Sequence, residues 1–176
     1  RTFFAESITI DGSKTAKFCT VHDKHLVVAG DPSTPSTIYF SATNDPTSFS
    51  GTGSGSIALE DQIVGIKSFR NDLIIFCQNS LFKLININDS SNIAVVPITQ
   101  NVGCMDGASI QEIGGDLLFL SPDGLRTVAG TARIGDVELS SVSRPIQSII
   151  QNIADNINNF TITSAVLRSK SQYRLF

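Results

Sequence analysis

A unit of short apolar strands separated by polar turns recurs along the chain, and this repeat limits the possible folds more than any other feature. Each copy has a first strand that alternates polar and apolar residues, a second strand that is apolar on both faces, and a third strand after another turn. The second strands begin at Leu26, Leu73 and Leu117, with spacings of 47 and 44 residues. One such sheet cannot bury both of its faces, so the repeat predicts stacked antiparallel sheets.

The repeat can be read three times in full and a fourth time in part. Turns 70–72 and 114–116 contain Asn, Asp or Gly, which tolerate the positive φ that tight hairpins need. A period of about 40–50 residues is typical of β-propeller blades. We therefore predict an all-β fold of antiparallel β-propeller blades, three and a partial fourth. The expected strands are residues 17–21, 26–29, 37–41, 64–69, 73–77, 81–85, 108–113, 117–120, 125–128, 161–167 and 173–176.

One segment departs from the strand pattern. Its isoleucines follow helical spacing, with Ser143 as a candidate N-cap and Pro145 in the first turn. The spacing predicts an amphipathic helix inserted at 144–157, which either packs on its own sheets or docks a neighbouring subunit. Because Arg1 stands where an initiator Met is expected, we interpret residues 1–176 as one β-propeller segment of a longer chain.

Composition excludes several classes of protein. The net charge is −3 and the basic residues are scattered, so no basic stripe for gripping phosphates is expected. No apolar run approaches the ~20 residues that cross a bilayer, which predicts no membrane span. The odd number of cysteines, Cys19, Cys77 and Cys104, favours buried free thiols and a reducing compartment, with a Cys19–Cys77 disulfide left open.

The search for a chemical site nominates no catalytic, cofactor-binding or metal-ligating residue. His22 and His25 lack a third ligand and are expected to be solvated turn residues. The glycine-rich stretch 51–55 lacks the lysine of a phosphate-binding loop, and Ser54 does not fit a nucleophile elbow. Loops 30–36 and 44–55 are expected either to form interfaces or to remain solvated.

Several segments resemble the β-propeller structural proteins of tailed bacteriophages, in their amino-acid sequence as well as in their order and spacing. Residues 26–41, 44–49 and 61–76 read LVVAGDPSTPSTIYFS, NDPTSF and DQIVGIKSFRNDLIIF. Residues 102–126 read VGCMDGASIQEIGGDLLFLSPDGLR, which is similar to a further blade of that family. The segments RIGD and SRPI, at 133–136 and 143–146, also match. The resemblance extends from about Phe18 to Phe176.

The resemblance implies a non-enzymatic virion component without a cofactor. Its nearest role is the tail nozzle of short-tailed phages, a homo-oligomeric ring around the DNA exit channel that docks other tail proteins. We expect assembly in the bacterial cytoplasm and transient passage of viral DNA without specific binding, which the acidic charge balance permits. The alternative is a carbohydrate-binding or hydrolytic propeller domain, which the dispersed glutamates and the absence of Trp disfavour.

Overall fold

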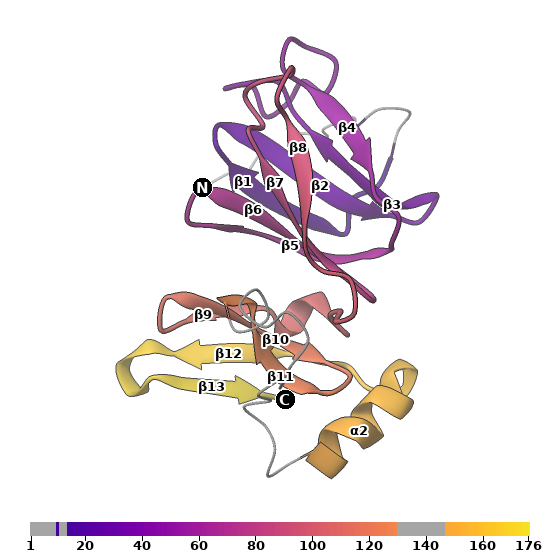
Figure 1. Ribbon diagram of the computed structural model, residues 1–176, viewed down its shortest axis with the longest axis vertical. Helices are drawn as coiled ribbons and strands as arrows, with labels where there is room; N and C mark the ends of the chain where they lie inside the picture. The colour runs from indigo at the N-terminus through magenta and orange to yellow at the C-terminus, as the bar shows by residue number, and fades with distance from the viewer. Residues whose placement is uncertain (1–9, 11–13, 130–146) are drawn as a thin grey trace, which may run out of the picture.

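Antiparallel sheets dominate the structure. The computed structural model describes residue 10, residues 14–129 and residues 147–176. These residues form mostly antiparallel β-sheet, together with the α-helix Gln147–Asp155 (α2), so the predicted all-β class is confirmed. Four sheets follow one another in an open stack, with the first sheet at one end and the last hairpin at the other (Figure 1). The described residues close no ring of sheets, so the β-propeller itself stays a prediction.

The first sheet has the order β1-β2-β3-β4. Its strands are Phe18–His22, His25–Asp31, Thr34–Phe40 and Gly55–Ala58. Asp23 and Lys24 have φ of 42° and 70°, which gives the β1–β2 hairpin a two-residue turn that matches the strand twist. Gly30 has φ of 88° at the register shift between β2 and β3, and a Cβ there would lie 2.8 Å from the Phe18 ring. A glycine is therefore required at this bulge.

The second sheet has the order β5-β6-β7-β8 and lies inside the stack. Its strands are Ile63–Phe69, Asp72–Cys77, Leu81–Ile85 and Ala94–Thr99. Every β6 residue after Asp72 is buried, because the strand is covered on both faces. Asp61 fixes the β6–β7 turn, since its Oδ2 accepts hydrogen bonds from Asn79 N and Ser80 Oγ, each at 2.7 Å.

The third sheet and the last hairpin complete the stack. The third sheet has the order β11-β10-β9, and the hairpin pairs β12 with β13. These strands are Gln111–Ile113 (β9), Asp116–Ser121 (β10), Gly124–Thr127 (β11), Ser164–Leu167 (β12) and Gln172–Leu175 (β13). Tyr173 Oη donates to the Ser109 carbonyl at 2.9 Å, and Gln111 Nε2 donates to the Ser164 carbonyl at 3.2 Å. The hairpin therefore contacts the third sheet.

A first apolar cluster joins the first two sheets. It contains Val27 and Ala29 of β2 and Leu73 and Ile75 of β6, all at most 1% exposed. A second cluster joins the second and third sheets. It contains the opposite face of β6, Ile74 and Phe76, and the β10 side chains Leu117 and Phe119. The second strands thus repeat one orientation: alternate side chains face the preceding sheet and the others face the following sheet.

Helix α2 spans Gln147–Asp155, inside the predicted range 144–157. Ile150 is 1% exposed and packs with Leu120 of β10 and with Ile162. Ile149 is 59% exposed. The helix therefore packs on its own chain through one face, as one of the two alternatives predicted. The expected cap Ser143, first-turn Pro145 and Ile146 lie outside the described residues.

Two predicted boundaries are wrong because side chains that cap turns were not recognised. Segment 30–36 is not a loop: β2 and β3 run through it and leave a two-residue turn. Asp31 closes this turn by accepting from Ser33 N at 2.8 Å and from Thr15 N at 2.7 Å. The strand expected from residue 108 begins as the 3-10 helix Gly107–Ser109, capped by Asp106, whose Oδ1 accepts from Ala108 N at 2.7 Å.

The first two sheets each have a fourth strand that the sequence pattern does not predict. β4 follows a stretch of Gly, Ser and Thr, and β8 contains Pro97, a residue that is tolerated only at a sheet edge. Both are edge strands with partly exposed side chains. Edge strands carry a weak hydrophobic pattern because only one side of their backbone is paired and little of their surface is buried.

Candidate functional site

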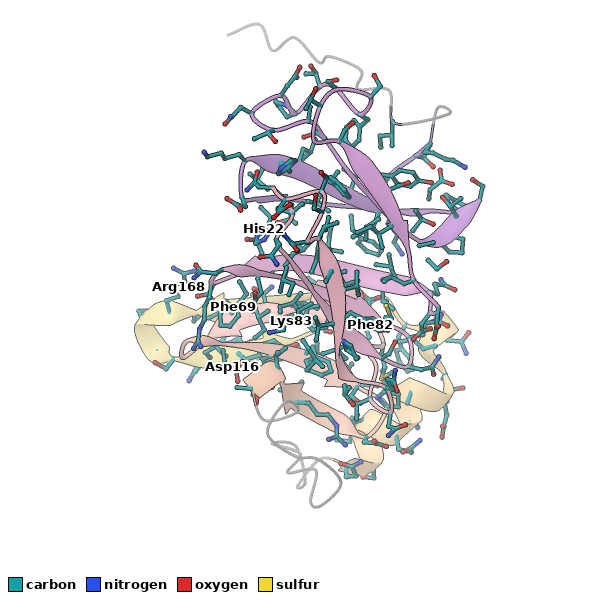
Figure 2. All side chains as sticks on the ribbon, turned by 45° about the horizontal axis from the view of Figure 1, so that its top comes forward. His22, Phe69, Phe82, Lys83, Asp116 and Arg168 are labelled. Carbon is teal, nitrogen blue, oxygen red and sulfur yellow. The ribbon has the colours of Figure 1, made fainter. Side chains whose placement is uncertain are left out.

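A cleft of about 320 Å³ opens where the second sheet meets the third, near Phe69, Lys83 and Asp116 (Figure 2). Its apolar residues come from three strands of the second sheet, β5, β6 and β8, and from the two residues that follow β11 of the third sheet. They are Phe69, Ile74, Pro97, Ile98, Val128 and Ala129. The volume suits one or two amino-acid side chains and lies at the low end of ligand sites. The cleft is thus a candidate recognition surface.

Four charged side chains line this cleft: Arg70, Asp72, Lys83 and Asp116. Each of them forms a hydrogen bond or an ion pair within the chain. The Arg70 guanidinium lies 5.0 Å from the centre of the Phe69 ring and donates to the Gly115 carbonyl at 2.8 Å, across the two sheets. Lys83 Nζ lies 3.8 Å from Asp72 Oδ2. Both of these side chains are more than one third exposed, so this ion pair contributes little stability.

The Asp116 carboxylate accepts hydrogen bonds from backbone amides of the third sheet and of the segment that follows it. Its Oδ1 accepts from Leu117 N at 2.8 Å and from Ala129 N at 3.1 Å. Asp72 and Asp116 occupy the same place in their repeats, directly before the leucine that begins each buried second-strand run. This recurrence was the sequence signal for the cleft, and it was overlooked because both residues were assigned to turns.

The two histidines are buried, so their prediction as solvated turn residues is wrong. His25 is 0% exposed; its Nδ1 donates to the Ser41 carbonyl at 2.6 Å, and its Nε2 lies 2.9 Å from Asn88 Oδ1. Asn88 follows β7 of the second sheet, and its amide also contacts Asp23. The loop after β7 therefore covers the β1–β2 turn.

His22 forms a polar link between the first two sheets. Its Nδ1 lies 2.9 Å from Ser68 Oγ of β5, and burial lowers the pKa of His22 below its ordinary value of 6.5. A serine beside a histidine has the reach of a nucleophile and its base. Here the pair lies in the contact between two sheets rather than in the cleft, so we assign it to the joining of the sheets.

The cysteines differ in their surroundings. All three are free; Cys77 and Cys104 are buried, whereas Cys19 is exposed, which corrects its predicted burial and leaves the Cys19–Cys77 disulfide unformed. Burial raises the pKa of both Cys77 and Cys104 to about 12. Their thiols are protonated at neutral pH and therefore poor nucleophiles.

The turn carboxylates and the glycine-rich stretch stabilise local structure. Asp123 Oδ2 accepts from the buried Arg126 at 3.1 Å, and Ser54 N and Oγ both donate to the Gly51 carbonyl. Asp11, another carboxylate beside a glycine, lies outside the described residues. Within the described ranges, no group of three or more His, Cys, Asp or Glu side chains is placed to hold a metal ion, and no helix could span a membrane.

Comparison with known proteins identifies no relative: no protein-family model matches the chain, and no curated protein sequence matches it.

Proposed function

We propose that this chain contributes β-propeller blades to a non-enzymatic structural component of a bacteriophage tail, as a ring subunit of the tail-nozzle kind. The observation that carries this proposal is the repeated orientation of the second strands. Successive antiparallel sheets pack face to face through apolar clusters in the same register positions. Such a series is how the blades of a propeller bury their faces.

The order of strands within the sheets supports the same architecture. The first strands of neighbouring sheets lie side by side at two steps, because β1 contacts β5 and β9 contacts β12. At the step between them, β5 contacts the 3-10 helix Gly107–Ser109, which precedes β9. From there the first two sheets run strand by strand away from this common side, in the orders β1-β2-β3-β4 and β5-β6-β7-β8. In a propeller the first strands surround the central channel.

The tail assignment rests on the resemblance carried by residues 26–41, 44–49, 61–76 and 102–126, and by the short segments 133–136 and 143–146. Two properties of the chain are compatible with it. The charged side chains of the cleft are engaged with the chain itself, as suits a rigid scaffold. The net charge of −3 suits a conduit that must release DNA, because each phosphate contact would add salt-dependent affinity.

Immunolabelling of intact virions tests this proposal. Antibodies raised against the purified chain are applied to particles of the phage that carries its gene, and the bound antibodies are located by electron microscopy. We expect labelling of a ring at the tail below the capsid, and its loss when the antibodies are first absorbed with the chain. Labelling confined to the capsid, or unlabelled particles, would contradict the tail assignment. Cleavage of host polysaccharide by the purified chain would contradict the non-enzymatic role.

A further inference from the structure

The cleft between the second and third sheets lies inside the stack, beside the tips of two hairpins. There the β5–β6 turn meets the β9–β10 turn, and Arg70 Nη2 donates to the Gly115 carbonyl at 2.8 Å. The second sheet is covered on its other face by the first sheet, and the third sheet is contacted by the last hairpin. The cleft therefore belongs to a contact between two sheets in the middle of the stack and not to either of its ends.

The acidic side chains of the cleft are matched by groups of the chain itself. Asp116 Oδ1 accepts from Leu117 N at 2.8 Å, and both Asp116 oxygens accept from Ala129 N, at 3.1 and 3.2 Å. Asp72 Oδ2 has the Lys83 ammonium group 3.8 Å away. Backbone amides thus compensate one carboxylate and an ammonium group compensates the other, which leaves little in the cleft to attract a cation.

The basic side chains of the cleft retain most of their hydrogen-bond donors. A guanidinium group has five N–H donors in one plane, and within the described part of the chain Arg70 bonds only to the Gly115 carbonyl. Lys83 Nζ lies 3.8 Å from Asp72 Oδ2, beyond the reach of a hydrogen bond. The unused hydrogen-bonding capacity of the cleft therefore lies with its two cations, and a carboxylate is the group that complements it.

Arg70 is held in place next to an apolar pocket. Its guanidinium carbon lies 5.0 Å from the centre of the Phe69 ring, and its bond to Gly115 ties it to the third sheet. A side chain that is already held loses less conformational entropy when a ligand binds. The pocket of about 320 Å³ has Ile74 and Val128, both almost fully buried, among its apolar lining. The cleft thus combines a positioned cation with room for an apolar side chain.

We propose that this cleft docks a partner protein through an apolar residue next to an acidic one, with the apolar side chain in the pocket and the carboxylate on Arg70. An apolar anchor in a pocket beside a charged group is the usual composition of an interface hot spot. A protein segment suits the cleft better than a free small molecule, because the volume is at the low end of ligand sites and Arg70 and Lys83 are exposed beside it. This docking site does not depend on the tail assignment.

Titration of the isotopically labelled chain with short peptides, followed by NMR, tests the docking site. The probe is a serine peptide, capped at both ends, with leucine followed by glutamate at its centre. We expect saturable shifts of the amide signals of Phe69, Arg70 and Ala129, which line the cleft. Glutamine in place of the glutamate, or glycine in place of the leucine, should each weaken binding by about tenfold. Isocaproate, a free carboxylate with a leucine-like side chain, should bind more weakly than the peptide.

Substitutions in the chain separate charge complementarity from damage to the fold. Arg70→Gln should weaken peptide binding by about tenfold, and Ala129→Leu should block the cleft. Lys24→Gln is the matched control, because Lys24 is exposed, has φ of 70° against 55° for Arg70, and lies in the corresponding turn of the first sheet. Asp72→Asn should tighten binding several-fold, because it removes the anion beside Lys83. A disturbed fold would not produce tighter binding.

Four results would overturn the proposed docking site: no saturable binding of the glutamate peptide, equal binding of the glutamine peptide, equal weakening by Lys24→Gln, or no tightening by Asp72→Asn. Binding of isocaproate as tight as that of the peptide would overturn the choice of a protein segment as the occupant. Unlabelled virions would leave this docking site standing, and a peptide that does not bind would leave the immunolabelling test unaffected.

Discussion

At the scale of single residues, buried polar groups set the relative positions of the first two sheets. His22 bonds to Ser68 of β5, and His25 lies between the Ser41 carbonyl and Asn88. A buried polar group without a partner costs about 1–3 kcal/mol, so these bonds favour one alignment of the sheets over its neighbours. The sequence shows the histidines but not their partners, because Ser68 and Asn88 are 46 and 63 residues away from them along the chain.

The titration of His22 predicts a pH-dependent stability. Burial lowers its pKa below 6.5, so the unfolded chain takes up this proton at a higher pH than the folded chain. The free energy of unfolding should fall as pH drops from about 7 to 6 and below, and the effect should end once the folded state is protonated too. His22→Asn removes this titration. Denaturant unfolding at a series of pH values should show the two proteins converging in stability as pH falls; a constant difference would contradict the prediction.

Gly103 is predicted to be the least replaceable glycine among those described. A Cβ at Gly103 would lie 1.8 Å from the Gln78 carbonyl oxygen, a backbone atom that cannot rotate away. Gly103→Ala should destabilise the fold by about 3 kcal/mol through overpacking. Gly114→Ala, which meets no atom within 4 Å but has φ of 60°, should cost roughly 1 kcal/mol. Urea unfolding measures both, and equal costs would refute the steric explanation.

At the scale of elements, burial separates those that the sequence predicts from those that it does not. β6 and β10 are covered on both faces, and their apolar runs locate them well. β4 and β8 lie at sheet edges, where partly exposed residues give no clear period. The capped turn at Asp31 and the 3-10 helix at Gly107–Ser109 depend on individual hydrogen bonds that periodicity does not reveal.

Neighbouring isoleucines test how α2 is attached. Ile150 is 1% exposed among Leu120 and Ile162, whereas Ile149 is 59% exposed. Ile150→Ala should lower the free energy of unfolding by about 2–4 kcal/mol, because it leaves a cavity. Ile149→Ala should change it by less than about 0.5 kcal/mol. Thermal or urea unfolding of the two variants provides the measurement, and similar effects would mean that the helix does not dock through Ile150.

At the scale of the whole molecule, stability depends on contacts between sheets, since the second sheet is covered by both of its neighbours. The two apolar clusters contain residues far apart in the sequence, and β6 contributes to both. We therefore expect the first three sheets to unfold together rather than separately, as in other stacked repeats where the interfaces carry much of the stability.

The aromatic contact between the second and third sheets should measure this coupling. The rings of Phe76 and Phe119 lie 5.4 Å apart in an edge-to-face arrangement. Phe76→Leu and Phe119→Leu should each cost roughly 1–2 kcal/mol, and a double-mutant cycle should give a coupling of about 0.5–1.5 kcal/mol. Phe40→Leu, in the first cluster, should be additive with Phe76→Leu. If the destabilising effects of Phe76→Leu and Phe119→Leu simply add in the double variant, the two rings are not in direct contact in solution.

The sequence by itself determined the all-β class, the repeated hairpins and the helix near residue 150, because these follow from local periodicity and from turn residues close to one another in the chain. Only the tertiary structure decided the fourth strands, the burial of His22 and His25, and the cleft that Arg70 and Asp116 share. These features depend on which sheet covers which, through contacts between residues dozens of positions apart. A pattern within one strand shows that a face is buried, but not which partner buries it.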